Sequence, residues 1–350
     1  MATFSKTSFN ASVYSLSRPT YPAKLFDYIF SYHSQGSPGV TRWDRAVDLG
    51  CGTGQATMQL RRFREVVGVD PSPGMLEKAR ANLAVGDHSR SPTATFKFVE
   101  GSAEDLKLNV EDESVDLVVA AQACHWFDWS KVWPETRRVL RRGGTAAFWV
   151  YTEFRLTKHP ALIPLITEYA QGSDPSTSVG PHFQRPGRTI LERYLVDVPE
   201  PSTVLKDATL SDIDRVFFGA DEGTTLPTNS RIEPILLRRE MRWRDLLGYF
   251  QTWSALHTYH EKFPDDLKRE EDTRFLEQDL ASVSRLASSL LLFYFYLFIH
   301  EDDIRGGDIS HRFWKDLRQR AAERSSNAKV GVNDKVEVEW PVALLLVRKL

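Results

Sequence analysis

The sequence has little cysteine: two residues, Cys51 and Cys124, in a chain of 350. Two cysteines cannot form a framework of several disulfides, and no CxxC or HExxH pattern is present to hold a metal ion. We therefore expect neither a disulfide-stapled secreted domain nor a metal site. Such sparse cysteine is typical of a protein of the reducing cytoplasm.

An excess of either charge is also missing. The chain has 45 Lys and Arg against 47 Asp and Glu, so its net charge would not attract nucleic acid or an anionic membrane. Its longest apolar run, residues 290–299, is about half of the roughly 20 residues that a membrane-spanning helix needs. The first twenty residues lack the apolar region and cleavage site of a secretory signal. The expected partner is a small molecule.

From about residue 21, short extended runs alternate with helical patterns. This order is typical of an α/β fold, a mostly parallel sheet with helices on both faces. The predicted strands are 45–49, 66–69, 95–99, 115–120 and 145–150. The predicted helices between them are 56–63, 74–83 and 130–140, the last capped by Gly143 and Gly144. An apolar stripe at residues 25, 26, 29 and 30, after Pro22, predicts an earlier helix.

The pattern changes after Tyr151, where Pro and Gly gather in 172–188 and 199–234. We expect residues 152–334 to form a helical and irregular cap that contributes to substrate binding, with an amphipathic helical segment at 244–259. Residues 335–350 alternate and then become apolar, which predicts a hairpin partner that completes the core sheet of residues 21–151 as its terminal strand.

A glycine-rich turn follows the first predicted strand, where AVDLG runs into GCGTG and then a helix expected from about Gln55. At Gly50, Gly52 and Gly54 a Cβ would block the approach of a ligand and resist the backbone angles of a tight turn. Twenty residues after Gly50 the second predicted strand ends in Asp70, whose carboxylate can accept hydrogen bonds from both hydroxyls of a ribose. A dinucleotide-binding fold is the nearest alternative, but its G-x-G-x-x-G fingerprint needs glycine at position 55.

Four successive stretches resemble the motifs of Rossmann-like S-adenosylmethionine-dependent methyltransferases: VDLGCGTG, VGVDPSPGML, FVEGSAEDL and DLVVAAQACHWFD. The likeness is closest to the fungal trans-aconitate methyltransferases, to which 4–22, 180–188, 236–241, 249–257 and 335–340 are also similar. It departs from that family at 274–304, which we expect to be an atypical insertion. The resemblance implies a seven-stranded Rossmann-like sheet, S-adenosyl-L-methionine as the cofactor, and methyl transfer.

The resemblance also implies a set of cofactor-binding residues near the ends of the first four strands: Asp48, Gly50, Gly52, Gly54, Asp70, Ser102, Ala103, Glu104 and Gln122. The glycines would line the cofactor, Asp48 would contact its methionine end directly or through water, and Asp70 would hold the ribose. Residues 102–104 would surround the adenine, and Gln122 would lie beneath the sulfonium. Many relatives have Asp where this chain has Ser102, so backbone amides or Glu104 could make the adenine contact instead.

The residues after the fourth strand are candidates for the reaction pocket, because ligands of open α/β sheets bind at such strand ends. His125 is a candidate base or hydrogen-bond donor, and Trp126 and Phe127 are candidates for the pocket floor. The alternative is a packed aromatic corner in which Asp128 caps the next helix.

Arginines that could grip a carboxylate through two parallel hydrogen bonds are the remaining candidates. Arg18 lies with Tyr14 in residues 1–20, an arm without helical or strand pattern that we expect over the active site. Arg188, in the turn PGR, is a second candidate. The alternative is that the arm is merely held on the surface. We expect Trp253 to be a core residue, and His257 and His260 to lie on an exposed helix face.

These residues lead to one principal hypothesis, carboxyl O-methylation of a small polycarboxylate resembling trans-aconitate. A carboxylate is ionised at neutral pH, since its reference pKa is about 4, and needs no general base. A phenol or hydroxyl acceptor would need one, and His125 would then be important. The alternatives are O- or C-methylation of a secondary metabolite, and a protein that binds the cofactor without catalysis.

Overall fold

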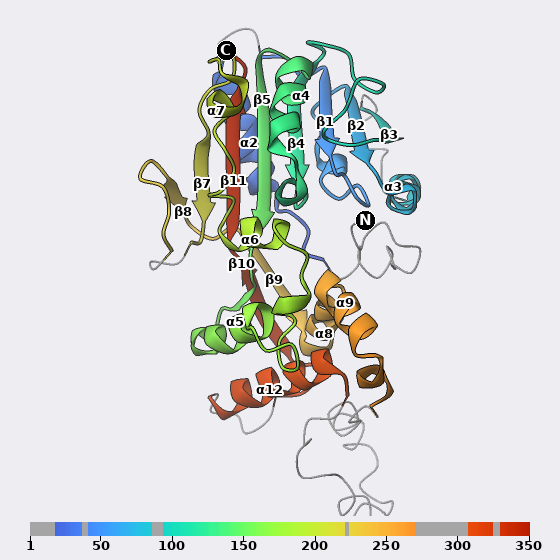
Figure 1. Cartoon of the computed structure of the whole chain (residues 1–350), viewed down its shortest axis with the longest axis vertical. Helices are drawn as coiled ribbons and strands as arrows, with labels where there is room; N and C mark the ends of the chain where they lie inside the picture. Colours follow the sequence, from blue (N-terminus) through green and yellow to red (C-terminus); the bar gives the residue numbers. More distant parts are fainter. Residues whose placement is uncertain (1–17, 37–40, 86–93, 221–223, 270–306, 325–329) are drawn as a thin grey trace, which may run out of the picture. The chain divides into compact units, whose positions relative to one another are not determined.

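The computed structural model describes residues 18–36, 41–85, 94–220, 224–269, 307–324 and 330–350 (Figure 1). The chain divides into two compact units: unit 1 has Met1–Thr152, Gln184–Leu237 and Trp340–Leu350, and unit 2 has Glu153–Phe183 and Arg238–Glu339. Tyr14 and the expected insertion at 274–304 lie outside the described residues. Within the described ranges, no helix is both long enough and apolar enough to span a bilayer.

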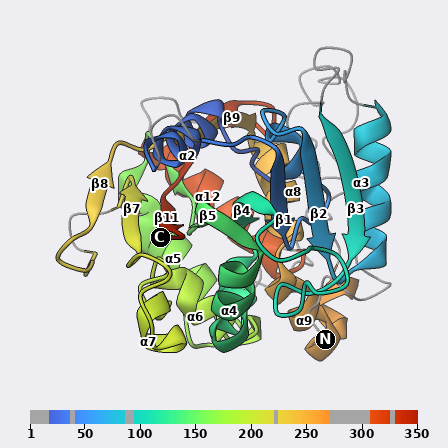
Figure 2. The same ribbon diagram turned by 90° about the horizontal axis from the view of Figure 1, so that it is seen from above.

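Unit 1 is built on an eight-stranded sheet in the order β3-β2-β1-β4-β5-β11-β7-β8 (Figures 1 and 2). Its strands are β1 (Arg45–Leu49), β2 (Glu65–Asp70), β3 (Thr95–Glu100), β4 (Val115–Ala121), β5 (Leu140–Tyr151), β7 (Asp214–Phe218), β8 (Arg231–Glu233) and β11 (Val342–Arg348). Strands β1 to β5 are parallel, whereas β11 is antiparallel to both β5 and β7. The expected mostly parallel Rossmann-like sheet is confirmed, with eight strands rather than seven.

Adjacent residues of β5 show how the sheet is covered on both faces. Trp149 meets Phe26 of helix α2 (Ala23–Gln35), with ring centroids 5.8 Å apart, whereas Phe148 meets Trp133 of helix α4 (Trp129–Val139) at 5.7 Å. Because successive side chains of a strand point to opposite faces, α2 and α4 cover opposite sides of the sheet (Figure 2). This sandwich explains why β4 and β11 are nearly continuous apolar runs, as is usual for strands buried on both faces.

The remaining helices of unit 1 are short, apart from α3 (Pro73–Val85), which covers the predicted range 74–83. They are η2 (Thr57–Gln59), η4 (Cys124–Trp126), α6 (Gly187–Glu192) and α7 (Pro201–Leu205).

The α-helix predicted at 56–63 was wrong, since this segment has one 3-10 turn, η2. Besides Ala56, its buried residues are Thr57, Leu60 and Phe63, which are spaced by three residues, the period of a 3-10 helix rather than an α-helix. The backbone bonds from Leu60 to Thr57 and from Phe63 to Leu60 have the same three-residue spacing.

The helix cap predicted at Gly143 and Gly144 was also wrong, because both residues lie inside β5. Helix α4 ends at Val139, and Leu140 is already extended, with ψ 136°. The N–H of Gly143 donates to the carbonyl of Lys349, so the glycine pair belongs to the sheet rather than to the helix end.

Residues 335–350 were predicted to complete the core sheet, and only their second half does so, because the two halves of this segment join different sheets. β11 enters the core sheet, whereas β10 (Lys335–Trp340) lies between β6 (Arg155–Leu156) and β9 (Leu237–Arg242) in a three-stranded sheet. Residues 184–237, expected in the cap, are grouped with unit 1, since they contribute β7 to the core sheet.

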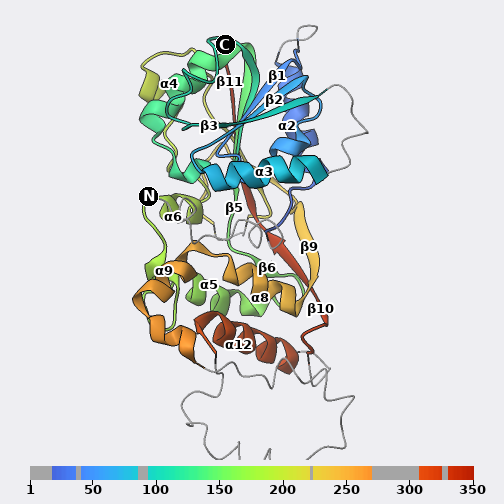
Figure 3. The ribbon, with the colours of Figure 1, turned by 90° about the vertical axis from the view of Figure 1, so that its right-hand side faces the viewer.

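Unit 2 combines the three-stranded sheet with helices around an aromatic core (Figure 3). The helices are η5 (Pro160–Leu162), α5 (Ile163–Gln171), η6 (Gly180–His182), α8 (Trp243–Gln251), α9 (Ser254–Lys262), η7 (Pro264–Lys268) and α12 (Ile309–Glu323). Trp253 is buried among Phe154, Tyr169 and Phe250, so the prediction that it is a core residue is confirmed. It also interrupts the helical segment predicted at 244–259, because its backbone is extended between α8 and α9.

The two histidines of α9 are less exposed than predicted. His260 lies 3.0 Å from a carboxylate oxygen of Asp308, which caps α12, and His257 lies 3.3 Å from Glu261. Among the residues with described positions, no cluster of three or more His, Cys, Asp or Glu side chains is arranged to hold a metal ion.

Candidate active site

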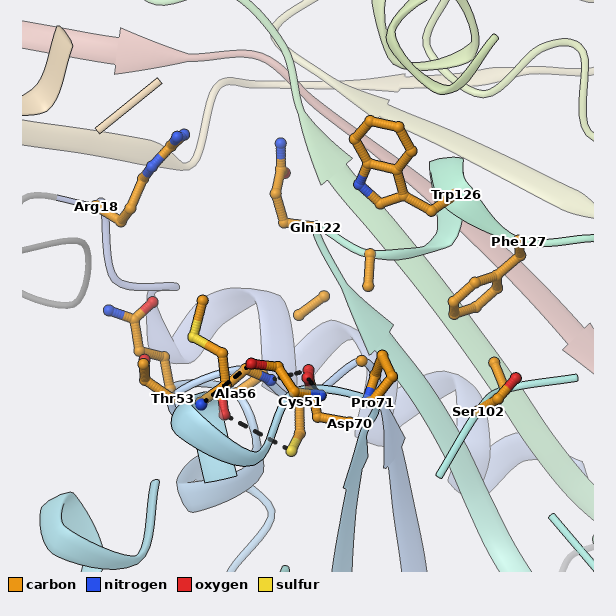
Figure 4. A pocket seen from close by; sticks show the side chains of 18 of the residues that line it. Arg18, Cys51, Thr53, Ala56, Asp70, Pro71, Ser102, Gln122, Trp126 and Phe127 are labelled. Atoms are coloured by element: carbon orange, nitrogen blue, oxygen red, sulfur yellow. Dashed lines mark hydrogen bonds between the residues drawn. The ribbon is translucent and has the colours of Figure 1, made fainter. Parts of the chain in front are cut away.

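A pocket opens at the edge of the sheet of unit 1 where β1, β2 and β4 end, the position at which open parallel sheets bind ligands (Figure 4). Its lining comes mainly from residues that follow those strand ends, joined by two that precede α2. The lining residues are Arg18, Tyr21, residues 50–53, Gln55, Ala56, residues 70–72, Met75, residues 102–104, residues 121–123, Trp126, Phe127 and Tyr151. All belong to unit 1.

The glycine-rich turn has left-handed backbone at each predicted position, with φ 67° at Gly50, 53° at Gly52 and 81° at Gly54. Gly50 and Gly52 line the pocket, but Gly54 does not. At φ 81° any side chain on Gly54 would be strained, and its Cβ would lie 3.0 Å from the end of Met58, so this glycine serves the turn rather than the pocket surface. A Cβ at Gly52 would have no neighbour within 4 Å, which leaves the backbone there open to a ligand.

Asp70 ends β2 with its carboxylate at the pocket wall. One oxygen accepts the N–H of Gly52 at 2.8 Å and the other accepts the N–H of Ser72 at 2.9 Å. Burial raises the pKa of Asp70, and these two backbone hydrogen bonds oppose that rise. Each carboxylate oxygen has a second lone pair, so Asp70 is held in place and can still accept two hydroxyl hydrogen bonds.

Asp48 lies behind the glycine-rich turn, fully buried and not among the lining residues. Its Oδ2 accepts the hydroxyl of Thr57 at 2.6 Å, and its Oδ1 has no hydrogen-bond partner within the described residues. Burial raises the pKa of Asp48 to about 7. Its expected contact with the methionine end of the cofactor stays a prediction.

The raised pKa of Asp48 predicts a stability change with pH. Between about pH 4 and about 7 the folded protein holds a proton on Asp48 that the unfolded chain has released, so this residue lowers the stability as pH rises through that window. In Asp48→Asn this loss should be absent. Urea unfolding at pH 5 and pH 8 measures it: the variant should gain stability relative to the parent at pH 8, whereas exposed Asp105→Asn should show no such gain. An equal difference at both pH values would contradict the assignment.

The predicted adenine wall, residues 102–104, lines the pocket next to the start of α4. The hydroxyl of Ser102 donates to the carboxylate of Glu104 and accepts the N–H of Glu104 at 3.1 Å. The other oxygen of Glu104 accepts the N–H of Asp128 at 3.1 Å. Asp128 in turn caps α4 by accepting the N–H of Ser130, as one of the two interpretations of this segment predicted.

Gln122 and Tyr151 lie at the ends of the neighbouring strands β4 and β5, on the side of the pocket nearer Arg18. The side-chain amide of Gln122 donates to the Tyr151 carbonyl at 3.1 Å and accepts the Tyr151 N–H at 2.7 Å. The Tyr151 hydroxyl accepts from Nη1 of Arg18 at 3.1 Å. Figure 4 shows Arg18, Gln122 and Trp126 on one side of the pocket, and Cys51, Asp70 and Pro71 on the other.

Two of the predicted acceptor residues do not line the pocket. His125 is 6% exposed, and burial, reinforced by Arg188 and Arg18, lowers its pKa to about 3, which leaves the ring neutral at pH 7. Arg188 is buried, with its Nε 2.8 Å from Glu192. Arg18, Trp126 and Phe127 do line the pocket.

Tyr151 is the main pocket residue that the sequence analysis missed. It ends β5, which was predicted as a strand, at the same edge of the sheet as Asp70. Extending the strand-end rule to the fifth strand would have found it.

The pocket fits the nucleoside-containing cofactor that the sequence motifs imply. The open face at Gly52 leaves room for a ligand against the backbone, and Asp70 presents a fixed acceptor for ribose hydroxyls beside it. Residues 102–104 form a wall on the far side of Asp70 for a base.

Comparisons with known proteins agree with this fit. Residues 47–148 match the family described as "Methyltransferase domain". A probable S-adenosylmethionine-dependent methyltransferase of Saccharomyces cerevisiae is 26% identical over 258 residues, which cover 73% of this chain and 83% of the relative. An uncharacterized methyltransferase of Mycobacterium tuberculosis is 40% identical over 140 residues, 39% of this chain and 49% of that one.

A solved structure of a proposed type II methyltransferase from Anaeromyxobacter dehalogenans shares the fold. Its TM-score is 0.56 at 21% identity, and the alignment covers 95% of this chain and 98% of that one. The matched domain, the relatives and the pocket agree, and the chain is therefore an S-adenosylmethionine-dependent methyltransferase with S-adenosyl-L-methionine as its cofactor.

Proposed function

We propose that this enzyme methylates a carboxyl group of a small polycarboxylate of the trans-aconitate type. The observation that carries the proposal is the position of Arg18, whose guanidinium lines the pocket on the side away from Asp70. A guanidinium there can bind a carboxylate by charge-assisted hydrogen bonds. The sequence resemblance to trans-aconitate methyltransferases points to the same class of acceptor.

The state of His125 supports a carboxylate rather than a hydroxyl acceptor. A hydroxyl must lose its proton, which needs a base close to it, but the His125 ring does not line the pocket. A carboxylate is already ionised at neutral pH and has no proton to lose. His125 is buried in η4, beside the point where the Trp126 ring packs closely against Gly187 of α6.

S-adenosylmethionine, when bound, supplies an activated methyl group. The protein's task is then to hold the acceptor in line with that group, and proximity and orientation can provide most of the acceleration. In this proposal Asp70 and the glycine-rich turn hold the cofactor, while Arg18 holds a carboxylate that is not being methylated. Trp126 and Phe127 add apolar surface to the lining of the pocket.

The product should be a methyl ester. Tritiated S-adenosylmethionine, incubated with the protein and a panel of small acids and phenols, labels the product, and mild alkali then releases the label as volatile methanol if an ester has formed. His125→Gln should keep a measurable rate on the same acceptor. Label that survives alkali, or loss of activity in His125→Gln while folding and cofactor affinity persist, would instead identify a hydroxyl or carbon acceptor.

A further inference from the structure

Gln122 has an unusual backbone for its residue type, with φ 57° directly after β4. Left-handed backbone is uncommon outside glycine and concentrates at functional sites, where the surrounding structure must hold it. Three hydrogen bonds hold it here: its N–H donates to the Trp149 carbonyl at 2.8 Å, and its side-chain amide makes the two bonds to Tyr151.

The paired bonds to Tyr151 make the Gln122 side chain act like an additional peptide group. The amide donates to the carbonyl and accepts from the N–H of one residue, the exchange that two opposite residues make in an antiparallel ladder, although β4 and β5 themselves run parallel. The β4–β5 pairing, whose last backbone partners are Ala121 and Trp149, is thereby continued to the final residue of β5. Both polar atoms of the Gln122 amide are directed to the protein backbone.

Tyr151 transmits this constraint to the acceptor side of the pocket. With its backbone fixed by Gln122, its ring packs against Tyr21 and Trp340, with centroids 6.5 and 6.4 Å apart. Its hydroxyl accepts from Nη1 of Arg18 at 3.1 Å. One hydrogen bond at the tip of the long Arg18 side chain therefore depends on a residue whose backbone is held from the end of β4.

We propose that Gln122 is a positioning residue for the methyl acceptor, which acts through Tyr151 on Arg18. This role differs from the sequence-based prediction, which placed Gln122 beneath the sulfonium of the cofactor. The consequence for the acceptor rests on the proposed function, in which Arg18 holds a carboxylate. The Gln122–Tyr151–Arg18 chain itself rests on the three residues' own hydrogen bonds and can be tested without any substrate.

The test measures how fast phenylglyoxal modifies the Arg18 guanidinium. Peptide mass spectrometry monitors the modification. Gln122→Met removes the amide at similar size, and Tyr151→Phe removes the hydroxyl. If the three residues form one chain, each variant should label about threefold faster, and the double variant no faster than either, because contacts in series are not additive. Gln59→Met, at an exposed position of η2, is the control and should label at the parental rate.

A second variant distinguishes the loss of the Gln122 side-chain hydrogen bonds from the effect of left-handed backbone at position 122. Asn adopts left-handed backbone readily but is one methylene shorter, so Gln122→Asn should fold and still fail to span both groups of Tyr151. If Gln122→Met does not fold, the Arg18 labelling rate of Gln122→Asn tests the proposal in its place. An unchanged Arg18 rate in a folded Gln122 variant, or rates that multiply in the double variant, would overturn the proposal.

The kinetic readout distinguishes this proposal from the proposed function. On the acceptor that the parent methylates, Gln122→Met should raise KM about five- to tenfold, with smaller change in kcat, and it should have no such effect in an Arg18→Ala background. Affinity for S-adenosylhomocysteine should stay at the parental level. If the product is stable to alkali, the carboxylate proposal fails, while the labelling rates still decide the role of Gln122.

Discussion

Gly50→Ala should lower the free energy of unfolding by about 2–5 kcal/mol, the combined cost of left-handed alanine and a steric overlap. The backbone at Gly50 has φ 67°, and an added Cβ would lie 2.5 Å from the Cβ of Ala123. That neighbour is a methyl group attached directly to the backbone, so no rotation can move it away. Urea unfolding of the purified variant measures the loss.

Two other glycines serve as matched controls for Gly50→Ala. Gly52 also has positive φ, but its added Cβ would meet nothing within 4 Å, so Gly52→Ala should lose only about 1–2 kcal/mol of stability. Gly74, at the start of α3, has neither strain nor a neighbour, and Gly74→Ala should not lose stability. Equal stability loss at all three positions would show that Ala123 does not limit the space at Gly50.

The larger effect of Gly52→Ala should be on the binding of the cofactor product rather than on stability. Its methyl group would occupy the open pocket face, so affinity for S-adenosylhomocysteine should fall about tenfold or more in a protein that remains folded. Calorimetric titration gives the affinity. Parental affinity in this variant would mean that the cofactor does not lie against the glycine-rich turn.

Asp70→Ala should weaken binding of S-adenosylmethionine or its demethylated product by about 1.5–3 kcal/mol, roughly 10- to 150-fold, the range for hydrogen bonds to a charged group. The variant loses the acceptor for the ribose hydroxyls. It also leaves the N–H groups of Gly52 and Ser72 without the carboxylate that now binds them, which loosens the turn. Calorimetric titration measures both ligands directly.

The control for Asp70→Ala is Glu100→Ala. Glu100 lies opposite Asp70 in the β2–β3 pairing but is exposed and does not line the pocket. Its replacement should leave cofactor affinity unchanged. If Asp70→Ala also binds within twofold of the parent, Asp70 is not part of the cofactor site.

The parts of the fold that the sequence predicted are those determined by local patterning. β1 was predicted at its observed bounds because its apolar residues are enclosed by charged residues and the glycine-rich turn. β8 and the three-stranded sheet were missed, because β8 has only three residues and β10 finds partners about a hundred or more residues away. The 3-10 turn η2 was misread because three-residue spacing over so short a segment resembles helical periodicity.

The candidate site divides in the same way. The predicted cofactor residues that line the pocket come from consecutive motifs, since each strand end supplies its own residues and the parallel sheet brings those ends together. The proposed acceptor side depends on contacts between distant segments. Arg18 reaches Tyr151 across 133 positions, and burial, which periodicity does not show, is what keeps the His125 ring out of the pocket.

The position of β11 has a consequence for how the protein is made. This strand lies between β5 and β7, but during translation residues 152–341 emerge from the ribosome after β5 and before β11. Until β11 pairs, the edge of β5 has no neighbouring strand. An unpaired strand edge of this kind can pair with other nascent chains. Chaperone capture of this half-built sheet, or slow decoding just before residue 342, should therefore influence the yield of active enzyme more strongly than either would for a sheet assembled in sequence order.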